Sequence, residues 1–165
     1  MLFQNVGRAD VDLKEAVGLV QRGNAILLLG AGFSVASKNR ENKPLPTGSQ
    51  LATRLALDLG LPDKYPLPVI AAQFVDTKGE IALTDLLSEI FSAETITPDQ
   101  ERIVLMPWRR MYTLNYDNIT EKVYKLRGKG LISLNYDSPV RTTDGHLQYI
   151  HLHGELNSGD AGRIR

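Results

Sequence analysis

The chain has 165 residues, of which 42% are hydrophobic and 23% are charged, a composition typical of one globular domain with a single core. Lysine plus arginine equals aspartate plus glutamate at 19 each, so the chain has no net charge that would attract it to nucleic acid or anionic membranes. The lack of cysteine excludes disulfides, thiolate nucleophiles and sulfur-based zinc sites, and all imidazole chemistry is confined to His146, His151 and His153.

The N-terminal residues 1–12 contain no apolar stretch of signal-peptide length. The most apolar segment, residues 25–36, is interrupted by glycines and is too short to span a bilayer. We therefore expect a cytoplasmic protein that does not cross a membrane, with residues 1–165 forming one domain.

The first part of the chain predicts two helices around a buried strand. Asp12 begins a capping-box pattern, and apolar residues at helical spacing follow as far as Gly23. Residues 24–29 (NAILLL) form a continuous apolar run, which predicts a strand buried on both faces. Residues 38–43 are polar and predict a loop, and a second capping-box pattern at 47–50 leads into an amphipathic helix.

The rest of the chain continues this alternation. Helices are predicted near residues 69–76 and 83–91, and another begins at Thr97, which precedes a proline at the first helical position. The remaining predicted elements are strand 110–114, helix 118–127, strand 131–134 and strand 147–152. Strands that alternate with helices indicate a Rossmann-like α/β fold, with a mainly parallel sheet and helices on both of its faces.

Three polar segments directly follow predicted strands. They are residues 30–34 (GAGFS), 113–117 (TLNYD) and 151–155 (HLHGE). Ligands of open parallel sheets bind beyond the carboxyl ends of the strands, where the loops converge. The three segments are therefore expected at one edge of one sheet.

Two glycines in the first segment suit a phosphate group. Gly30 and Gly32 allow a tight turn and let backbone N–H groups approach a diphosphate closely. The alternative is that both glycines merely end a buried strand, and a lone pair of glycines does not decide between the two.

The second segment supplies an amide and a carboxylate. Asn115 can donate and accept hydrogen bonds, so it could hold a carboxamide, a ribose hydroxyl or an attacking water. Asp117 could orient that amide or favour a positive charge nearby, but Asp117 or Asn118 could equally cap the following helix. The same tetrapeptide, LNYD, recurs at 134–137, where Asn135 is predicted to be a turn residue because no helix follows.

The third segment supplies a candidate general base. His153 precedes Gly154 at a strand end, and an imidazole titrates near neutral pH. Strand alternation places His151 on the same face but deeper in the domain. The alternative for either residue is a hydrogen-bonded structural histidine.

In this order and context, the three segments resemble the GAG-x-S, T-x-N-x-D and HG segments of the sirtuin (silent-information-regulator) family. The NYDN variant and the stretch LPTGSQL at 45–51 resemble most the sirtuin-like domains of bacterial antiphage defence proteins, which hydrolyse NAD+ to ADP-ribose and nicotinamide. The resemblance runs from about Asn24 to Glu155 and implies a sirtuin-like NAD-binding domain with NAD+ nucleosidase activity.

The resemblance also implies roles for individual residues. Asn115 would position water against the ribose anomeric carbon, Asp117 would help hold the nicotinamide end, and His153 would be the base. NAD+ would be the substrate, and no metal is expected. No strong acid is needed because nicotinamide leaves as a neutral molecule, so the site acts mainly by positioning and electrostatics. The residues assigned to NAD+ binding are Gly30, Ala31, Gly32, Phe33, Ser34 and Thr113.

Departures from the family pattern limit what the resemblance implies. The four-cysteine zinc module of sirtuin deacylases is absent, which weakens the alternative of a protein deacylase. The family's last strands would lie beyond Arg165, so we expect a C-terminally incomplete fold that works with further domains or subunits or as a homo-oligomer, and whose activity in isolation is in doubt.

Three other functions were considered. A non-catalytic sensor or scaffold module that binds NAD or ADP-ribose fits the same residues. A dinucleotide oxidoreductase fits poorly, because Val35 stands where the third glycine of its motif is required. Nucleic-acid contact through Trp108, Arg109 and Arg110 is not expected of a chain with zero net charge.

Overall fold

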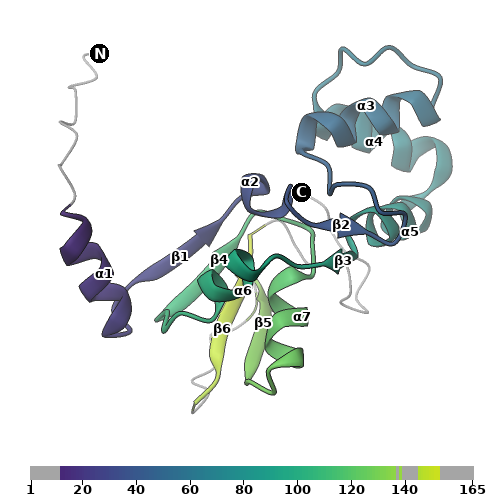
Figure 1. Ribbon diagram of the computed structural model, residues 1–165. Coiled ribbons are helices and arrows are strands. Elements are labelled where there is room, and N and C mark those ends of the chain that lie inside the picture. The colour runs from purple at the N-terminus through teal and green to yellow at the C-terminus, as the bar shows by residue number, and fades with distance from the viewer. Residues whose placement is uncertain (1–11, 137, 139–144, 153–165) are drawn as a thin grey trace, which may run out of the picture.

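The computed structural model describes residues 12–136, 138 and 145–152 (Figure 1). Its helices are α1 (Leu13–Gln21), α2 (Ala31–Ser34), α3 (Gly48–Asp58), α4 (Leu67–Lys78), α5 (Glu80–Phe91), α6 (Pro98–Val104) and α7 (Ile119–Leu126). Its strands are β1 (Ile26–Leu29), β2 (Lys38–Asn39), β3 (Ala93–Thr95), β4 (Arg110–Thr113), β5 (Leu131–Asn135) and β6 (Leu147–His151). Within these residues, no helix combines the length and the apolar character needed to cross a membrane.

The main sheet has four strands in the order β1-β4-β6-β5, and every neighbouring pair is parallel. Helices lie between β1 and β4 and between β4 and β5 in the chain, as the crossover connections of parallel strands require. This arrangement confirms the predicted α/β, Rossmann-like class. All strand ends that carry the polar segments therefore lie at one edge of the sheet.

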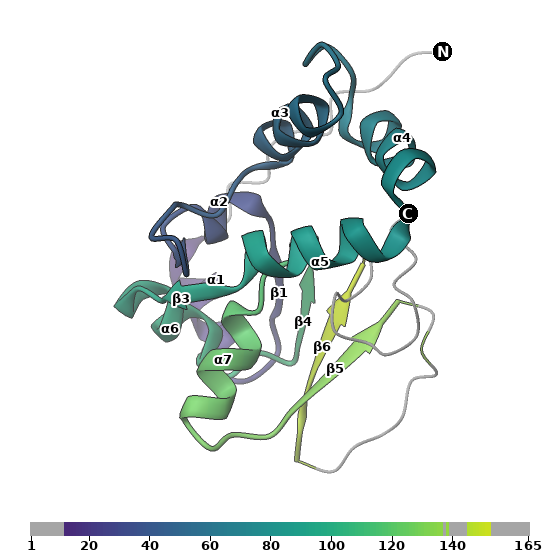
Figure 2. The ribbon, with the colours of Figure 1, turned by 90° about the vertical axis from the view of Figure 1, so that its right-hand side faces the viewer.

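One face of the sheet forms the first hydrophobic core. The register places Leu27, Met111 and Tyr149 in a row across adjacent strands. Met111 and Tyr149 belong to one buried cluster with Leu29 of β1 and with Ile119 and Val123 of α7. Figure 2 shows α7 lying along this side of the sheet. Because α7 is packed against the strands, it holds in place the segment 114–118 that precedes it. This segment contains the candidate site residues Asn115 and Asp117.

The prediction that residues 24–29 form a strand buried on both faces is wrong for the second face. Ile26 and Leu28 are 58% and 59% exposed in the described structure, while Leu29 on the opposite face is buried. The reason is that, in the described structure, β1 packs on the core through only one of its faces, the face that carries Leu27 and Leu29.

A second core lies among α3, α4 and α5, beyond the carboxyl ends of the strands (Figures 1 and 2). Its buried residues are Leu51, Ala52, Leu55, Ala56, Ile70, Phe74, Leu83, Leu87 and Phe91. The predicted capping box forms at the start of α3, where Thr47 and Gln50 bond to each other's backbone. Helices α4 and α5 are longer than predicted, and all three helices lie where the periodicity placed them.

Two features were not predicted. A single turn of helix, α2, follows β1 directly, with Gly30 as its extended N-cap. The polar stretch 38–43 is not wholly a loop, because β2 pairs antiparallel with β3 in a small second sheet. This sheet ties the segment after α2 to the segment after α5.

Candidate functional site

The turn from β1 into α2 leaves room for a ligand. A Cβ atom added to Gly30 or Gly32 would meet no atom within 4 Å, and neither glycine has a positive φ. Neither packing nor backbone conformation within the described structure therefore requires glycine at these positions. An open approach to the backbone is what a bound phosphate or ribose would need.

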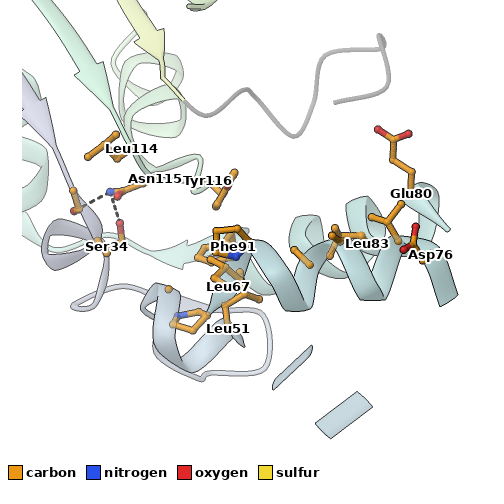
Figure 3. Close-up of a pocket in the computed structure, with 18 residues that line it drawn as sticks. Ser34, Leu51, Leu67, Asp76, Glu80, Leu83, Phe91, Leu114, Asn115 and Tyr116 are labelled. Carbon is orange, nitrogen blue, oxygen red and sulfur yellow. Dashed lines mark hydrogen bonds between the residues drawn. The ribbon is translucent and has the colours of Figure 1, made fainter. Parts of the chain in front are cut away.

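Asn115 is fixed at the end of β4 by bonds to the β1–α2 turn. Its Nδ2 donates to the carbonyl oxygen of Gly30 at 3.0 Å and to Ser34 Oγ at 2.8 Å (Figure 3). Its backbone N–H donates to Thr113 Oγ1 at 2.9 Å. The side-chain Oδ1 accepts no hydrogen bond from the described residues, so it is the atom of Asn115 left for a ligand or water.

Asp117 lies behind Asn115 and is 3% exposed. Its Oδ2 accepts the hydroxyl proton of Ser34, and its Oδ1 accepts the backbone N–H of Ile119 at 3.1 Å. Burial raises the pKa of Asp117, and these two hydrogen bonds act in the opposite direction. The helix-capping alternative is thus correct for one oxygen, whereas Asn118 instead accepts from the backbone of Ala93 at 3.1 Å.

A cavity of about 710 Å³ opens next to these residues, a size typical of small-molecule sites. Its polar end is formed by Gly30, Ala31, Ser34 and Asn115, and its walls come from α3, α4 and α5 (Figure 3). The wall residues are Pro46, Gly48, Leu51, Leu67, Pro68, Ala71, Ala72, Val75, Leu83, Phe91, Leu114 and Tyr116, with Asp76 and Glu80 farther along. The cavity can therefore hold a long ligand that has a polar part and a flat apolar part.

An aromatic pair lies at the middle of the cavity. The rings of Phe91 and Tyr116 are 5.8 Å apart and tilted by 54°. Burial raises the pKa of the Tyr116 phenol, so this ring is neutral at physiological pH. The pair offers a heterocyclic ring an apolar surface with one polar atom.

The structure brings together only part of the predicted site. Gly30, Ala31, Ser34 and Asn115 line the cavity, whereas Gly32, Phe33, Thr113 and Asp117 are not among the described lining residues. The Phe33 carbonyl instead accepts from Gln100 Nε2 at 2.6 Å, and Thr113 supports Asn115. His153 lies outside the described residues.

His151 has a structural environment. It is buried under α7, where its Nε2 lies 2.9 Å from Ser133 Oγ and 3.0 Å from Glu121 Oε1. Its ring meets the edge of Tyr149 at a centroid distance of 4.7 Å. These contacts match the alternative of a hydrogen-bonded histidine that ties α7 to β5 and β6.

Sequence reasoning missed the apolar wall of the cavity. Residues such as Leu67, Ala71 and Val75 recur at helical spacing, which predicts an ordinary buried helix face and carries no signal of a ligand. Two side chains in the region of the nucleic-acid alternative have partners within the domain. Lys122, a basic residue of α7, pairs with Glu94 at 3.4 Å. The indole N–H of Trp108 donates to the carbonyl of Ile103 at 2.7 Å.

Fold and site together define a Rossmann-like α/β domain with a cavity beyond the carboxyl ends of its strands, an arrangement consistent with a sirtuin-like fold. In agreement, the chain is 26% identical over 160 residues to defense-associated sirtuin 2 of Bacillus subtilis, a match that covers 91% of this chain and 15% of that protein. It is 30% identical over 136 residues to the NAD(+) hydrolase ThsA of Cytobacillus dafuensis, covering 82% of this chain and 26% of that protein. No family model matches the chain.

These similarities confirm the resemblance to sirtuin-like domains of defence proteins that the three motifs predict. The chain spans about a quarter or less of the length of the two relatives. The activities of those whole proteins are therefore only proposals for this chain.

Proposed function

We propose that this domain hydrolyses NAD+ at the nicotinamide–ribose bond, giving nicotinamide and ADP-ribose, as part of a protein that acts in antiphage defence. The observation that carries the proposal is the orientation of Asn115. Its amide nitrogen is bound to Gly30 and Ser34, so its Oδ1 is left to accept a hydrogen bond from a water molecule at the polar end of the cavity. A water held in this way directs an oxygen lone pair toward the ribose carbon.

The reaction needs positioning more than acid catalysis. The bond between the ribose carbon and the nicotinamide nitrogen breaks, and its electron pair neutralises the positively charged ring. Water then forms a bond to the cationic sugar and loses one proton, for which His153 is the predicted acceptor. The apolar wall and the Phe91–Tyr116 pair suit a departing neutral ring.

The name of one relative supports this choice of reaction, since ThsA is an NAD(+) hydrolase that is similar over 82% of this chain. A non-catalytic sensor of NAD or ADP-ribose would use the same cavity. The two functions differ in whether nicotinamide is released.

The test is nicotinamide release from NAD+ by the intact protein and by Asn115→Ala and His153→Ala. Loss of the oriented amide is expected to lower kcat by about 100-fold, as small misplacements of a reacting group do. Asn39→Ala is a matched control, because Asn39 is 7% exposed against 8% for Asn115 and lies outside this cavity. It should keep kcat within about twofold.

The outcomes distinguish hydrolysis from sensing and test the role of Asn115. Release that is lost in Asn115→Ala and kept in Asn39→Ala supports the proposal. Binding of NAD+ without release by the unmodified protein would favour the sensor. Release that Asn115→Ala leaves unchanged would overturn the assignment of Asn115.

A further inference from the structure

The hydrogen bonds behind Asn115 have a fixed direction. A carbonyl oxygen can only accept, so the atom of Asn115 that faces Gly30 must be the amide nitrogen. The same nitrogen donates to Ser34 Oγ, so the hydroxyl proton of Ser34 is free to go elsewhere and goes to Asp117. Donation therefore runs from Asn115 to Ser34 and from Ser34 to Asp117.

Both carboxylate oxygens of Asp117 accept hydrogen bonds from the protein. One carboxylate oxygen accepts from Ser34, and the other accepts from the backbone of Ile119. The side chain is buried and does not line the cavity. This arrangement differs from the role of holding nicotinamide that the family resemblance implies for Asp117.

We propose that Asp117 is a positioning residue that acts through Ser34 to keep Oδ1 of Asn115 available to the reacting water. As a carboxylate it accepts a hydrogen bond from Ser34, which points the hydroxyl proton away from Asn115 and leaves an Oγ lone pair for the Asn115 amide. The inference rests on the proposed function and adds a residue that controls turnover without touching substrate.

Reversal of the Asp117–Ser34 bond shows what the carboxylate contributes. If Asp117 became a donor, the Ser34 hydroxyl proton would have to leave Asp117 and point either into the cavity that Ser34 lines or toward Asn115, whose nitrogen cannot accept it. Asn115 could accept only by turning its Oδ1 inward, which would bring Oδ1 against the Gly30 carbonyl at about the present 3.0 Å. The turned amide would lose both of its bonds and present a donor to the cavity.

Acidification should cause the same reversal. Burial raises the pKa of Asp117, and Glu121 on α7 raises it further. The other titratable group that the field of Asp117 reaches is Tyr149 on β6, whose phenol is kept neutral by burial. Loss of kcat on the acid side is therefore expected at a higher pH than the ordinary Asp value of 3.8 would give.

The test compares Asp117→Asn, Ser34→Ala and the double variant in the intact protein. Each single variant is expected to lower kcat for nicotinamide release by roughly 10- to 100-fold. Asp117→Asn, at a position that does not line the cavity, is expected to leave KM for NAD+ within about twofold. The double variant should be no worse than about twice the more severe single variant, because both act on one chain of bonds. The acid limb of the kcat profile should disappear in Asp117→Asn.

Ser133→Ala is the matched control. Ser133 Oγ also donates to a carboxylate, Glu121 Oε1 at 3.2 Å, but this pair lies outside the cavity. The control should keep kcat within about twofold. A raised KM with unchanged kcat in Asp117→Asn, or effects of Ser34→Ala and Asp117→Asn that multiply, would overturn the proposal in favour of direct ligand contact.

A second measurement does not need turnover. The side-chain amide protons of Asn115, observed by NMR, should exchange slowly with solvent and should exchange at least about tenfold faster in Asp117→Asn and Ser34→Ala. Unchanged exchange would overturn the positioning role even if both variants are inactive. Absence of nicotinamide release by the unmodified protein would refute the proposed function instead, so the two failures are distinguishable.

Discussion

Asn115→Asp tests the hydrogen-bond direction at the site with a nearly isosteric change. At pH 8 the new carboxylate would place an acceptor 3.0 Å from the Gly30 carbonyl and would lose the donor to Ser34. Two lost bonds cost about 0.5–1.5 kcal/mol each, and the buried acceptors left unsatisfied cost about 1–3 kcal/mol more. The free energy of unfolding should fall by about 2–6 kcal/mol, and a loss of about 4 kcal/mol lowers Tm by roughly 8–16 °C in a domain of this size.

The pH dependence of this variant separates the explanation from general damage. A protonated carboxyl can donate to Gly30, so the pKa of the new side chain should be raised in the folded state. Its stability is then greatest at low pH and is lost as the pH rises through that pKa. Urea unfolding at pH 5 and pH 8 should show a larger deficit at pH 8, while Asn115→Ala should show the same deficit at both. An Asn115→Asp variant as stable as the unmodified protein at pH 8 would refute the reasoning.

Two further predictions concern stability. Leu55→Ala removes a side chain that is 0% exposed in the second core and should cost about 2–5 kcal/mol in urea unfolding, whereas Leu57→Ala, at a position 68% exposed on the same helix, should cost less than about 0.5 kcal/mol. Equal losses would mean that the α3–α5 core does not form. Glu121→Ala removes the acceptor shared by Ser133 and His151 and should cost about 1–3 kcal/mol, and Glu121→Gln, which keeps an oxygen acceptor, should recover part of that loss. Equal stability of the two Glu121 variants would contradict this account.

Much of the fold follows from local signals. The capping boxes at Thr47 and Thr97 both form, because a side chain that bonds a backbone three residues away needs no tertiary contact. The pairing of β2 with β3 could not be predicted, because Lys38 meets Thr95 across 57 residues and each strand is very short. The exposure of Ile26 and Leu28 depends on which face of β1 packs on the core, which an apolar run does not encode.

The sequence predicts where the candidate site lies in the fold, but it does not predict most of the hydrogen bonds and packing contacts within the site. The meeting of Ser34 and Asn115 follows from the rule that ligand loops gather at the carboxyl ends of parallel strands. The engagement of Asp117 by Ser34 depends on how α2 turns, and that turn was not predicted. The wall residue Leu67 has the pattern of an ordinary core helix, so only the packing of α3, α4 and α5 reveals that it borders a cavity.

The tetrapeptide LNYD occurs twice in the chain, and its asparagine has different contacts in the two copies because they lie at the ends of different strands of the sheet. The first copy follows β4, which has neighbouring strands on both sides. Its Asn115 donates a hydrogen bond to the Gly30 carbonyl in the turn that follows the adjacent strand, β1. The second begins in β5 at the border of the sheet, where the buried Oδ1 of Asn135 meets no partner in the described structure. A scan for the tetrapeptide alone would return two equal hits, and strand order is what singles out one of them.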